Sequence, residues 1–158
     1  MNTPSNRPPR AEYIARVNRA IDHINGNLAG DLSLQTLSAV ANFSPFYFHR
    51  IFKAITGETL NHFIGRARLA RACFLLRNNP KHSITAIAYD CGFSSSATFA
   101  RAFRSAFSTT AAVWRQSALP EESKNCKVLD KLGKAATDIA IYRDQAREVS
   151  SDDLPTAM

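Results

Sequence analysis

The sequence predicts an all-α fold in which one helix-turn-helix unit occurs twice. Apolar residues recur at spacings of three and four through most of the chain up to residue 119, as they do along one face of a helix. Ser, Gly, Asn and Pro stand at the breaks between these stretches, which is typical of helix ends. The stretch SLQTLSAVANFS, residues 33–44, also returns as SITAIAYDCGFS at residues 83–94. No alternation typical of a strand precedes residue 119.

The first expected helix carries one apolar stripe and ends at a glycine. The stripe consists of Ile14, Val17, Ile21, Ile24 and Leu28, and Gly30-Asp31 breaks it. The residues before it, 1–12, are polar and rich in proline. We expect them to form a disordered lead-in, since they bury little apolar surface.

The first helix-turn-helix unit is predicted at about 33–56. Ser33 is suited to the N-cap of a short helix, and Asn42-Phe43 to the turn that follows. Ser44 would cap the second helix, with Pro45 at its first position, where the missing N–H is not needed.

A longer helix is predicted at about 59–77, and Asn78-Asn79-Pro80 would end it. Its inward residues are expected to follow one stripe: Leu60, Phe63, Ala67, Ala70 and Phe74.

The second unit is predicted at about 83–107, with Gly92 in its turn and Trp114 anchoring one more short helix. Serines 33 and 83 are offset by 50 residues, and the offset becomes 51 after the turn, so the second turn has one extra residue. At the new offset the following residues correspond: Phe48 and Phe99, Arg50 and Arg101, Phe52 and Phe103, Lys53 and Arg104. Such a repeat indicates duplicated helix-turn-helix units, with a purely structural helical repeat as the alternative.

The positive charge lies in the body of the chain. The net charge is +7, of which +9 falls on residues 1–119 and −2 on residues 120–158. This balance favours a nucleic-acid partner, although many basic proteins have none.

Several classes of site are not expected. The three cysteines, Cys73, Cys91 and Cys126, are odd in number and form no CxxC pair, so neither a disulfide framework nor a zinc site is indicated. The four histidines lack HExxH spacing, and GxSxG is absent. We expect no catalysis, no metal and no cofactor. Cys73 and Cys91 are expected in the core.

The segment FSPFYFHRIFK, residues 43–53, would have two faces on a helix. The apolar residues share one face, and Phe46, His49, Arg50 and Lys53 share the other, at helical spacing. A helix that reads a major groove needs this division: donors for base edges, cations for phosphates and apolar surface for thymine methyl groups.

These patterns resemble the DNA-binding domain of the AraC/XylS family of bacterial transcription regulators. The resemblance covers roughly residues 17–116 and rests on LSLQTLSAVANFSPFYFHRIFK, RLARACFLL, ITAIAYDCGFSSSATFARAFR and WR, in the order and spacing of the family. It implies a domain at 13–117 with two homeodomain-like, three-helix subdomains joined by a long linker helix. Each subdomain would offer its second helix to one of two successive major-groove segments.

Carried over by position, the resemblance implies a set of DNA-binding residues. The first reading helix would offer Phe46, His49 and Arg50 to bases and Lys53 to phosphates. The second would offer Ser96, Ala97, Thr98, Ala100 and Arg101, with Arg104 near phosphates. Because the alanines provide only methyl groups, we expect Arg101 to be its main base reader and the hydroxyls of Ser95, Ser96 and Thr98 to lie near the backbone. The chain departs from the family pattern at Ser108, where Gly is usual, and at Ala111, where Pro is usual.

The expected partners are double-stranded DNA, bound as a monomer, and RNA polymerase; no membrane is expected. The expected location is the cytoplasm, at the nucleoid, and the expected role is that of an activator. The tail, 118–158, is expected to be weakly structured. The chain resembles either a short regulator of the MarA and SoxS group or the DNA-binding part of a longer one with a gyrase-inhibitor-like effector domain. A protein-interaction module that binds no DNA is the other alternative.

Overall fold

The computed structural model describes residues 9–117; residues 1–8 and the tail at 118–158 lie outside the described part. The described residues are all-α and contain no strand, as the sequence predicted. Their helices are α1 (Arg10–Gly26), α2 (Leu34–Ala41), α3 (Pro45–Thr56), α4 (Leu60–Asn78), α5 (Ile84–Asp90), α6 (Ser96–Phe107) and α7 (Ala111–Gln116).

Helix α1 begins at Arg10, inside the segment 1–12 that we expected to be disordered. Pro9 precedes the helix in an extended conformation, which proline readily adopts, and Glu12 forms an ion pair with Arg16 one turn later. Tyr13 is buried against the rest of the first core, which gives this first turn a reason to be ordered. The boundary expected from composition was therefore placed too late.

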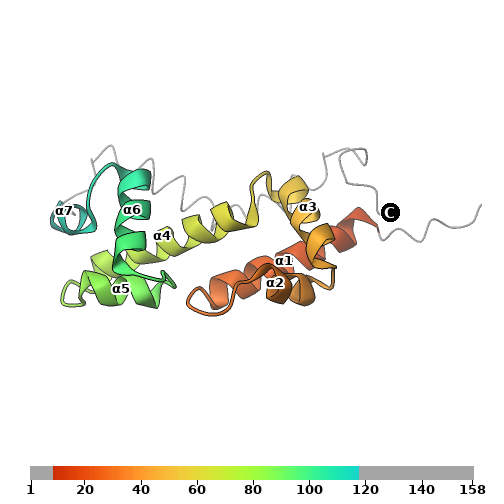
Figure 1. Ribbon diagram of the computed structural model, residues 1–158, viewed down its shortest axis with the longest axis horizontal. Helices are drawn as coiled ribbons and strands as arrows, with labels where there is room; N and C mark the ends of the chain where they lie inside the picture. Colours follow the sequence, from red (N-terminus) through yellow and green to blue (C-terminus); the bar gives the residue numbers. More distant parts are fainter. Residues whose placement is uncertain (1–8, 118–158) are drawn as a thin grey trace, which may run out of the picture.

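Two hydrophobic cores lie at the two ends of α4 (Figure 1). The first is built by α1, α2, α3 and the beginning of α4, with Phe48, Phe52 and Phe63 in edge or tilted contact. The second is built by the end of α4 with α5, α6 and α7, and Phe103 and Trp114 meet edge to face within it. Each core thus belongs to one three-helix unit together with one half of α4.

Helix α4 does not bury the single stripe that we expected. Phe74, predicted to point inward, is 55% exposed. The residues that are buried fall in two groups, Leu60, Phe63 and Ile64 near the start, and Leu69, Ala72, Cys73 and Leu76 near the end. At about 100° per residue the two groups lie roughly 180° apart around the helix. The prediction was wrong because one helix serves two separate cores on opposite faces.

The repeat seen in the sequence is also a repeat of the backbone. In the first turn Phe43 donates its N–H to the carbonyl of Ser38, and in the second Phe93 donates to Ala88, with the same offset of 50 between 43 and 93. The second helices then begin after N-caps at residues 44 and 95, offset by 51. The inserted residue is therefore Ser94.

The serine caps agree with the sequence with one exception. Ser33, Ser83 and Ser95 each accept a hydrogen bond from the backbone N–H three residues later. Ser44 stands at the N-cap of α3 but its hydroxyl makes no such bond. Pro45, at the first helical position, has no N–H, so the start of α3 has one fewer N–H group without a partner inside the helix.

Candidate nucleic-acid interface

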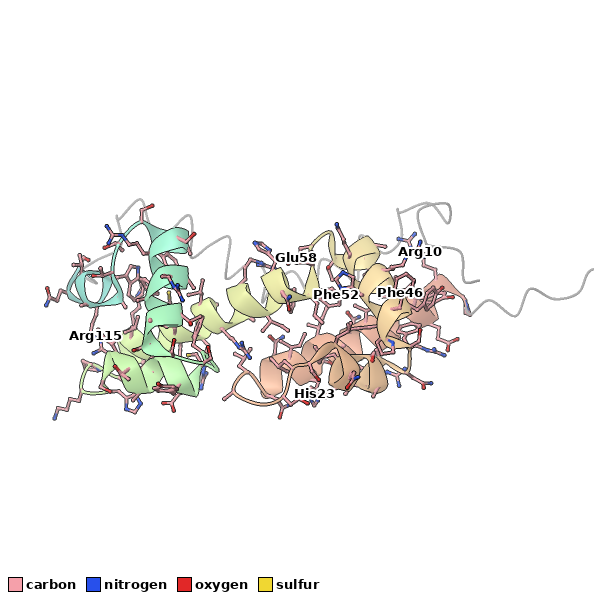
Figure 2. The ribbon with its side chains drawn as sticks, viewed as in Figure 1. Arg10, His23, Phe46, Phe52, Glu58 and Arg115 are labelled. Atoms are coloured by element: carbon pink, nitrogen blue, oxygen red, sulfur yellow. The ribbon has the colours of Figure 1, made fainter. Side chains whose placement is uncertain are left out.

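Helix α3 separates its apolar and polar residues in the way the sequence predicted. Phe48, Ile51 and Phe52 are fully buried, whereas Phe46 is 73% exposed. Figure 2 shows Phe46 and Phe52 on opposite sides of the helix. The exposed residues on the outward side are the four predicted ones: Phe46, His49, Arg50 and Lys53.

The ring of Phe46 interacts with the side chain that follows it one turn later. The guanidinium carbon of Arg50 lies 5.7 Å from the centre of that ring. A cation at this distance from an aromatic face is attracted by the ring's negative face. Besides offering an apolar surface, the exposed ring of Phe46 thus holds the guanidinium of Arg50 on the outward side of α3.

Helix α6 repeats the arrangement with smaller side chains. Phe99, Phe103 and Phe107 are buried, and Ala97, Ala100, Arg101 and Arg104 are exposed. The two alanines take the positions that Phe46 and His49 have in α3, so the outward face of α6 has methyl groups where α3 has an aromatic ring and an imidazole.

Two of the three hydroxyl groups at the start of α6, those of Ser95 and Thr98, are already hydrogen-bonded to each other. The N–H of Thr98 donates to Oγ of Ser95 over 3.1 Å, and the two hydroxyls are 2.9 Å apart. Ser96 is exposed and makes no such pair with another described residue. Ser95 therefore caps the helix and its hydroxyl is paired with that of Thr98, so only the remaining hydrogen-bonding capacity of these two groups is left for another molecule.

Neither α3 nor α6 contains an acidic residue. Within residues 9–117, the four cations on their outward faces form no ion pair: Arg50, Lys53, Arg101 and Arg104. Figure 1 shows the two helices upright at opposite ends of α4, so the basic faces belong to two separate helices on one spacer. Positive charge that is not neutralised by an intramolecular ion pair is suited to an anionic ligand.

Two residues outside the predicted set, Glu58 and Arg115, make contacts within the units that carry α3 and α6. Burial raises the pKa of Glu58, but hydrogen bonds from Arg66 and His62 and their charges outweigh burial, so the net pKa lies below the usual range. Figure 2 shows Glu58 near the connection of α3 and α4. Arg115 donates to the carbonyl of His82 over 2.7 Å and so ties α7 to the loop before α5. Helical periodicity does not mark these two residues, because Glu58 pairs with side chains of α4 from the loop before that helix and Arg115 bonds a backbone carbonyl.

The structure also bears on other chemistry. Among residues 9–117 no group of three or more His, Cys, Asp or Glu side chains could hold a metal ion. Cys73 and Cys91 are buried, as expected, and burial raises the pKa of Cys73 to about 12 and that of Cys91 to about 11. Both thiols therefore stay protonated and unreactive near neutral pH. In the described part of the chain no helix is long and apolar enough to cross a membrane.

Comparison with known proteins identifies the family. A family model described as a helix-turn-helix domain matches residues 37–117, which is more than half of the chain. The chain belongs to the AraC/XylS family. The family and the fold are those of DNA-binding transcription regulators, which are not enzymes. The transcriptional regulator Rob of Salmonella typhimurium is 36% identical over 94 residues, which cover 60% of this chain and 32% of Rob.

Solved structures give the same assignment. An AraC-type transcriptional regulator from Chromobacterium violaceum matches 70% of this AraC/XylS chain and 99% of its own length, with a TM-score of 0.63 and 28% identity. The DNA-binding domain of AdpA, solved with a target DNA, matches 65% of the chain and 92% of its own length at a TM-score of 0.62; at 24% identity it supports the fold alone. The chain spans about a third of the length of the first curated relatives that it matches.

Proposed function

We propose that this chain is a sequence-specific, DNA-binding transcriptional regulator, whose helices α3 and α6 read two successive segments of the major groove. The observation that carries the proposal is the pair of outward basic faces on repeat-equivalent helices. Arg50 and Arg101 correspond, as do Lys53 and Arg104, and all four are exposed. A solvated surface charge has no reason to recur at the same place in both units.

The spacing of the two helices supports this reading. Helix α4 has 19 residues, which corresponds to a length of roughly 28 Å. Major-groove segments on one face of DNA recur about every 34–36 Å. One chain can therefore span two segments, and a monomer suffices. AdpA, whose DNA-binding domain shares this fold, was solved with a target DNA.

The two helices are proposed to contribute unequally. Phe46, His49 and Arg50 offer α3 an aromatic surface and two kinds of donor, whereas Ala97 and Ala100 offer α6 only methyl groups. We assign most base discrimination to α3, and to α6 the role of a clamp, with Arg101 as its main base reader. The hydroxyls of Ser95, Ser96 and Thr98 and the Arg104 side chain are assigned to the phosphate backbone.

A binding assay tests the proposal. Anisotropy of a labelled random-sequence duplex would show whether the chain binds DNA, and in vitro selection would give a preferred site. Arg50→Ala and Arg101→Ala should each weaken binding to that site by about 1–3 kcal/mol. The matched control is Arg19→Ala, which removes one exposed arginine from α1. No binding of wild type, or equal effects of all three substitutions, would contradict the proposal.

A saturation scan of the selected site tests the unequal roles. Each well-read base pair is typically worth about 1–3 kcal/mol. Substitutions under α3 should then cost more in total than those under α6. Equal information in the two half-sites would contradict the assignment.

RNA polymerase as a partner, a role as activator and a cytoplasmic location at the nucleoid follow from this proposal and are part of it. The alternative, the DNA-binding part of a longer effector-sensing regulator, is favoured by one observation: Rob and the other first relatives are about three times as long as the matching region. Both forms predict the same DNA contacts. An interaction module without DNA binding would leave the anisotropy of the duplex unchanged at low and moderate salt.

A further inference from the structure

The two units come close to each other beside the shared helix α4. The carbonyl of Leu28, in the loop between α1 and α2, accepts a hydrogen bond from Nε of Arg68 on α4 over 3.1 Å. The same carbonyl lies against Gly92, in the turn between α5 and α6. A loop of the first unit therefore contacts the turn of the second, and Figure 1 shows that loop reaching toward the α5–α6 turn.

The contact at Gly92 leaves no room for a side chain. A Cβ atom there would lie 2.0 Å from the Leu28 carbonyl oxygen and 2.9 Å from Nε of Arg68. Real Cβ atoms do not approach backbone so closely. The φ of Gly92 is +91°, which also favours glycine. The three groups are thus packed together, and the close approach depends on the missing side chain.

Arg68 is held in a partly buried position by this contact. Burial lowers the pKa of its guanidinium below the usual range. An arginine loses hydration on burial, so its location is explained only by what it contacts there. Next to it, an open cleft of about 460 Å³ separates the units, with Leu32 and Ser33 on one side and Phe93 and Thr98 on the other. Close packing therefore does not fix the two units along this cleft.

Helix α4 has a weak point between its two halves. Its buried groups end at Ile64 on one face and resume at Leu69 on the opposite face. Gly65 lies between them, and a Cβ there would meet nothing within 4 Å. Glycine inside a helix raises the freedom of the backbone. A small bend or twist of α4 at Gly65 would rotate α3 relative to α6. The hydrogen bond from Arg68, which follows Gly65 on α4, to Leu28 of the first unit links the parts on the two sides of this position.

We propose that the Arg68 side chain, the Leu28 carbonyl and Gly92 form a latch that fixes the orientation of α3 relative to α6, and that Arg68 is thereby a positioning residue for the spacing of the two half-sites on DNA. The part that concerns DNA rests on the proposed function. Arg68 contacts no base in this scheme. Arg68 instead determines the distance between half-sites at which the chain binds DNA well.

The latch itself is tested on the free protein. Spin labels on Ala54→Cys and Ser105→Cys, both exposed, would report the distance between α3 and α6 in a full-length Cys126→Ser chain. The native thiols of Cys73 and Cys91 are buried and stay unlabelled. Arg68→Met should broaden the distance distribution measured by pulsed electron resonance. An unchanged distribution in a folded variant would overturn the latch.

A pair of glycine substitutions gives a matched control. Gly92→Ala and Gly57→Ala both place a Cβ on a backbone with positive φ, but a Cβ at residue 57 meets no atom within 4 Å. Both changes strain the backbone, and only the first pushes against Leu28. Gly92→Ala should shift or broaden the distance distribution, and Gly57→Ala should leave it as in wild type. The same change in both would overturn the proposal.

The spacing role is tested on the DNA site selected by wild type, with base pairs inserted or removed between its half-sites. Two linked reading helices act as a bivalent binder whose gain depends on geometry, so Arg68→Met should lose about tenfold at the original spacing. It should also discriminate less than wild type between the original and altered spacings. A uniform loss at all spacings would overturn the positioning role. Absence of DNA binding by wild type would overturn the proposed function and this role with it, while the distance measurement would still judge the latch.

Discussion

Ser108, which ends α6, offers a test of how much backbone strain at a helix C-cap lowers the stability of the fold. Ser108 has a φ of 57° and a ψ of 23°, in the left-handed region, and its N–H donates to the carbonyl of Arg104 over 2.9 Å. At the repeat-equivalent position Gly57 ends α3 with a φ of 78° and donates to Lys53 over 2.9 Å. The two caps have the same geometry, with a glycine in one and a serine in the other. Ser108→Gly should therefore stabilise the fold.

The size of the gain follows from two opposing terms. A residue with a Cβ in the left-handed region costs about 1–2 kcal/mol, which glycine relieves. Glycine has more freedom in the unfolded chain, which takes back about 0.4–1 kcal/mol. The net gain for Ser108→Gly is about 0.5–1 kcal/mol, or about 2–5 °C in Tm for a folded region of this size. The reverse change, Gly57→Ser, should lose about as much, since a Cβ there meets no atom within 4 Å.

Thermal and urea unfolding of the wild type and both variants, followed by circular dichroism at 222 nm, would measure these differences. The urea slope should stay constant, because neither change alters the surface exposed on unfolding. Effects of opposite sign in the two variants would support the strain argument. A lower Tm for Ser108→Gly, or a gain for Gly57→Ser, would refute it, because backbone strain at the cap would then not decide the stability of these positions.

Three further predictions concern charge and the tail. Glu58→Gln should lower the free energy of unfolding by about 1–2 kcal/mol at pH 7, because the three hydrogen bonds that the carboxylate makes with Arg66 and His62 are weakened. Since the folded-state pKa is lowered from 4.5, this contribution is present above that value and is lost as pH falls through the folded-state pKa. The free energies of unfolding of variant and wild type should therefore converge as the pH falls below the folded-state pKa of Glu58, and a constant gap would contradict the assignment. Log affinity for duplex DNA should fall with log salt at about −0.9 per phosphate contact, and each of Lys53→Ala and Arg104→Ala should reduce the slope by about 1; a flat salt dependence would exclude an electrostatic interface. A chain ending at Leu119 should keep its helicity and DNA affinity, as its net charge of +9 lies before the tail; loss of either on truncation would place the tail within the domain.

Local periodicity predicted the buried face of α3 because one short helix packs against one core. Phe48, Ile51 and Phe52 recur at helical spacing, and all three are fully buried. The same reasoning placed the turn, since its residues must reverse the chain within a few positions. Features that depend on residues close in the sequence, such as the buried face of α3 and the turn before it, could thus be predicted from the sequence. The outward residues of α3 followed as the complement of the buried ones, but what they bind remains a prediction.

Helix α4 shows where this reasoning stops. Its stripe of apolar residues is continuous on a helical wheel, and Phe74 belongs to it, yet Phe74 is 55% exposed. The sequence records that residues are apolar and does not record that two cores approach the helix from opposite sides. The contact between Arg68 and Leu28 is hidden for a different reason. The acceptor of this hydrogen bond is a backbone carbonyl, which every residue has, so no pattern of side chains in the sequence predicts the contact.

The glycines of the repeat show how local backbone conformation and tertiary contacts together determine a residue. The four positive-φ positions among residues 9–117 form two repeat-equivalent pairs, Asn42 with Gly92 and Gly57 with Ser108, and each pair has glycine on one side only. The backbone conformation is thus shared by both units and does not by itself decide the residue. At residue 92 a tertiary contact decides it, because the Leu28 carbonyl occupies the space of a Cβ atom. At residue 57 the space is open, so only the conformation favours glycine. A duplicated unit can therefore keep its turns while its residues diverge, except where the two copies touch.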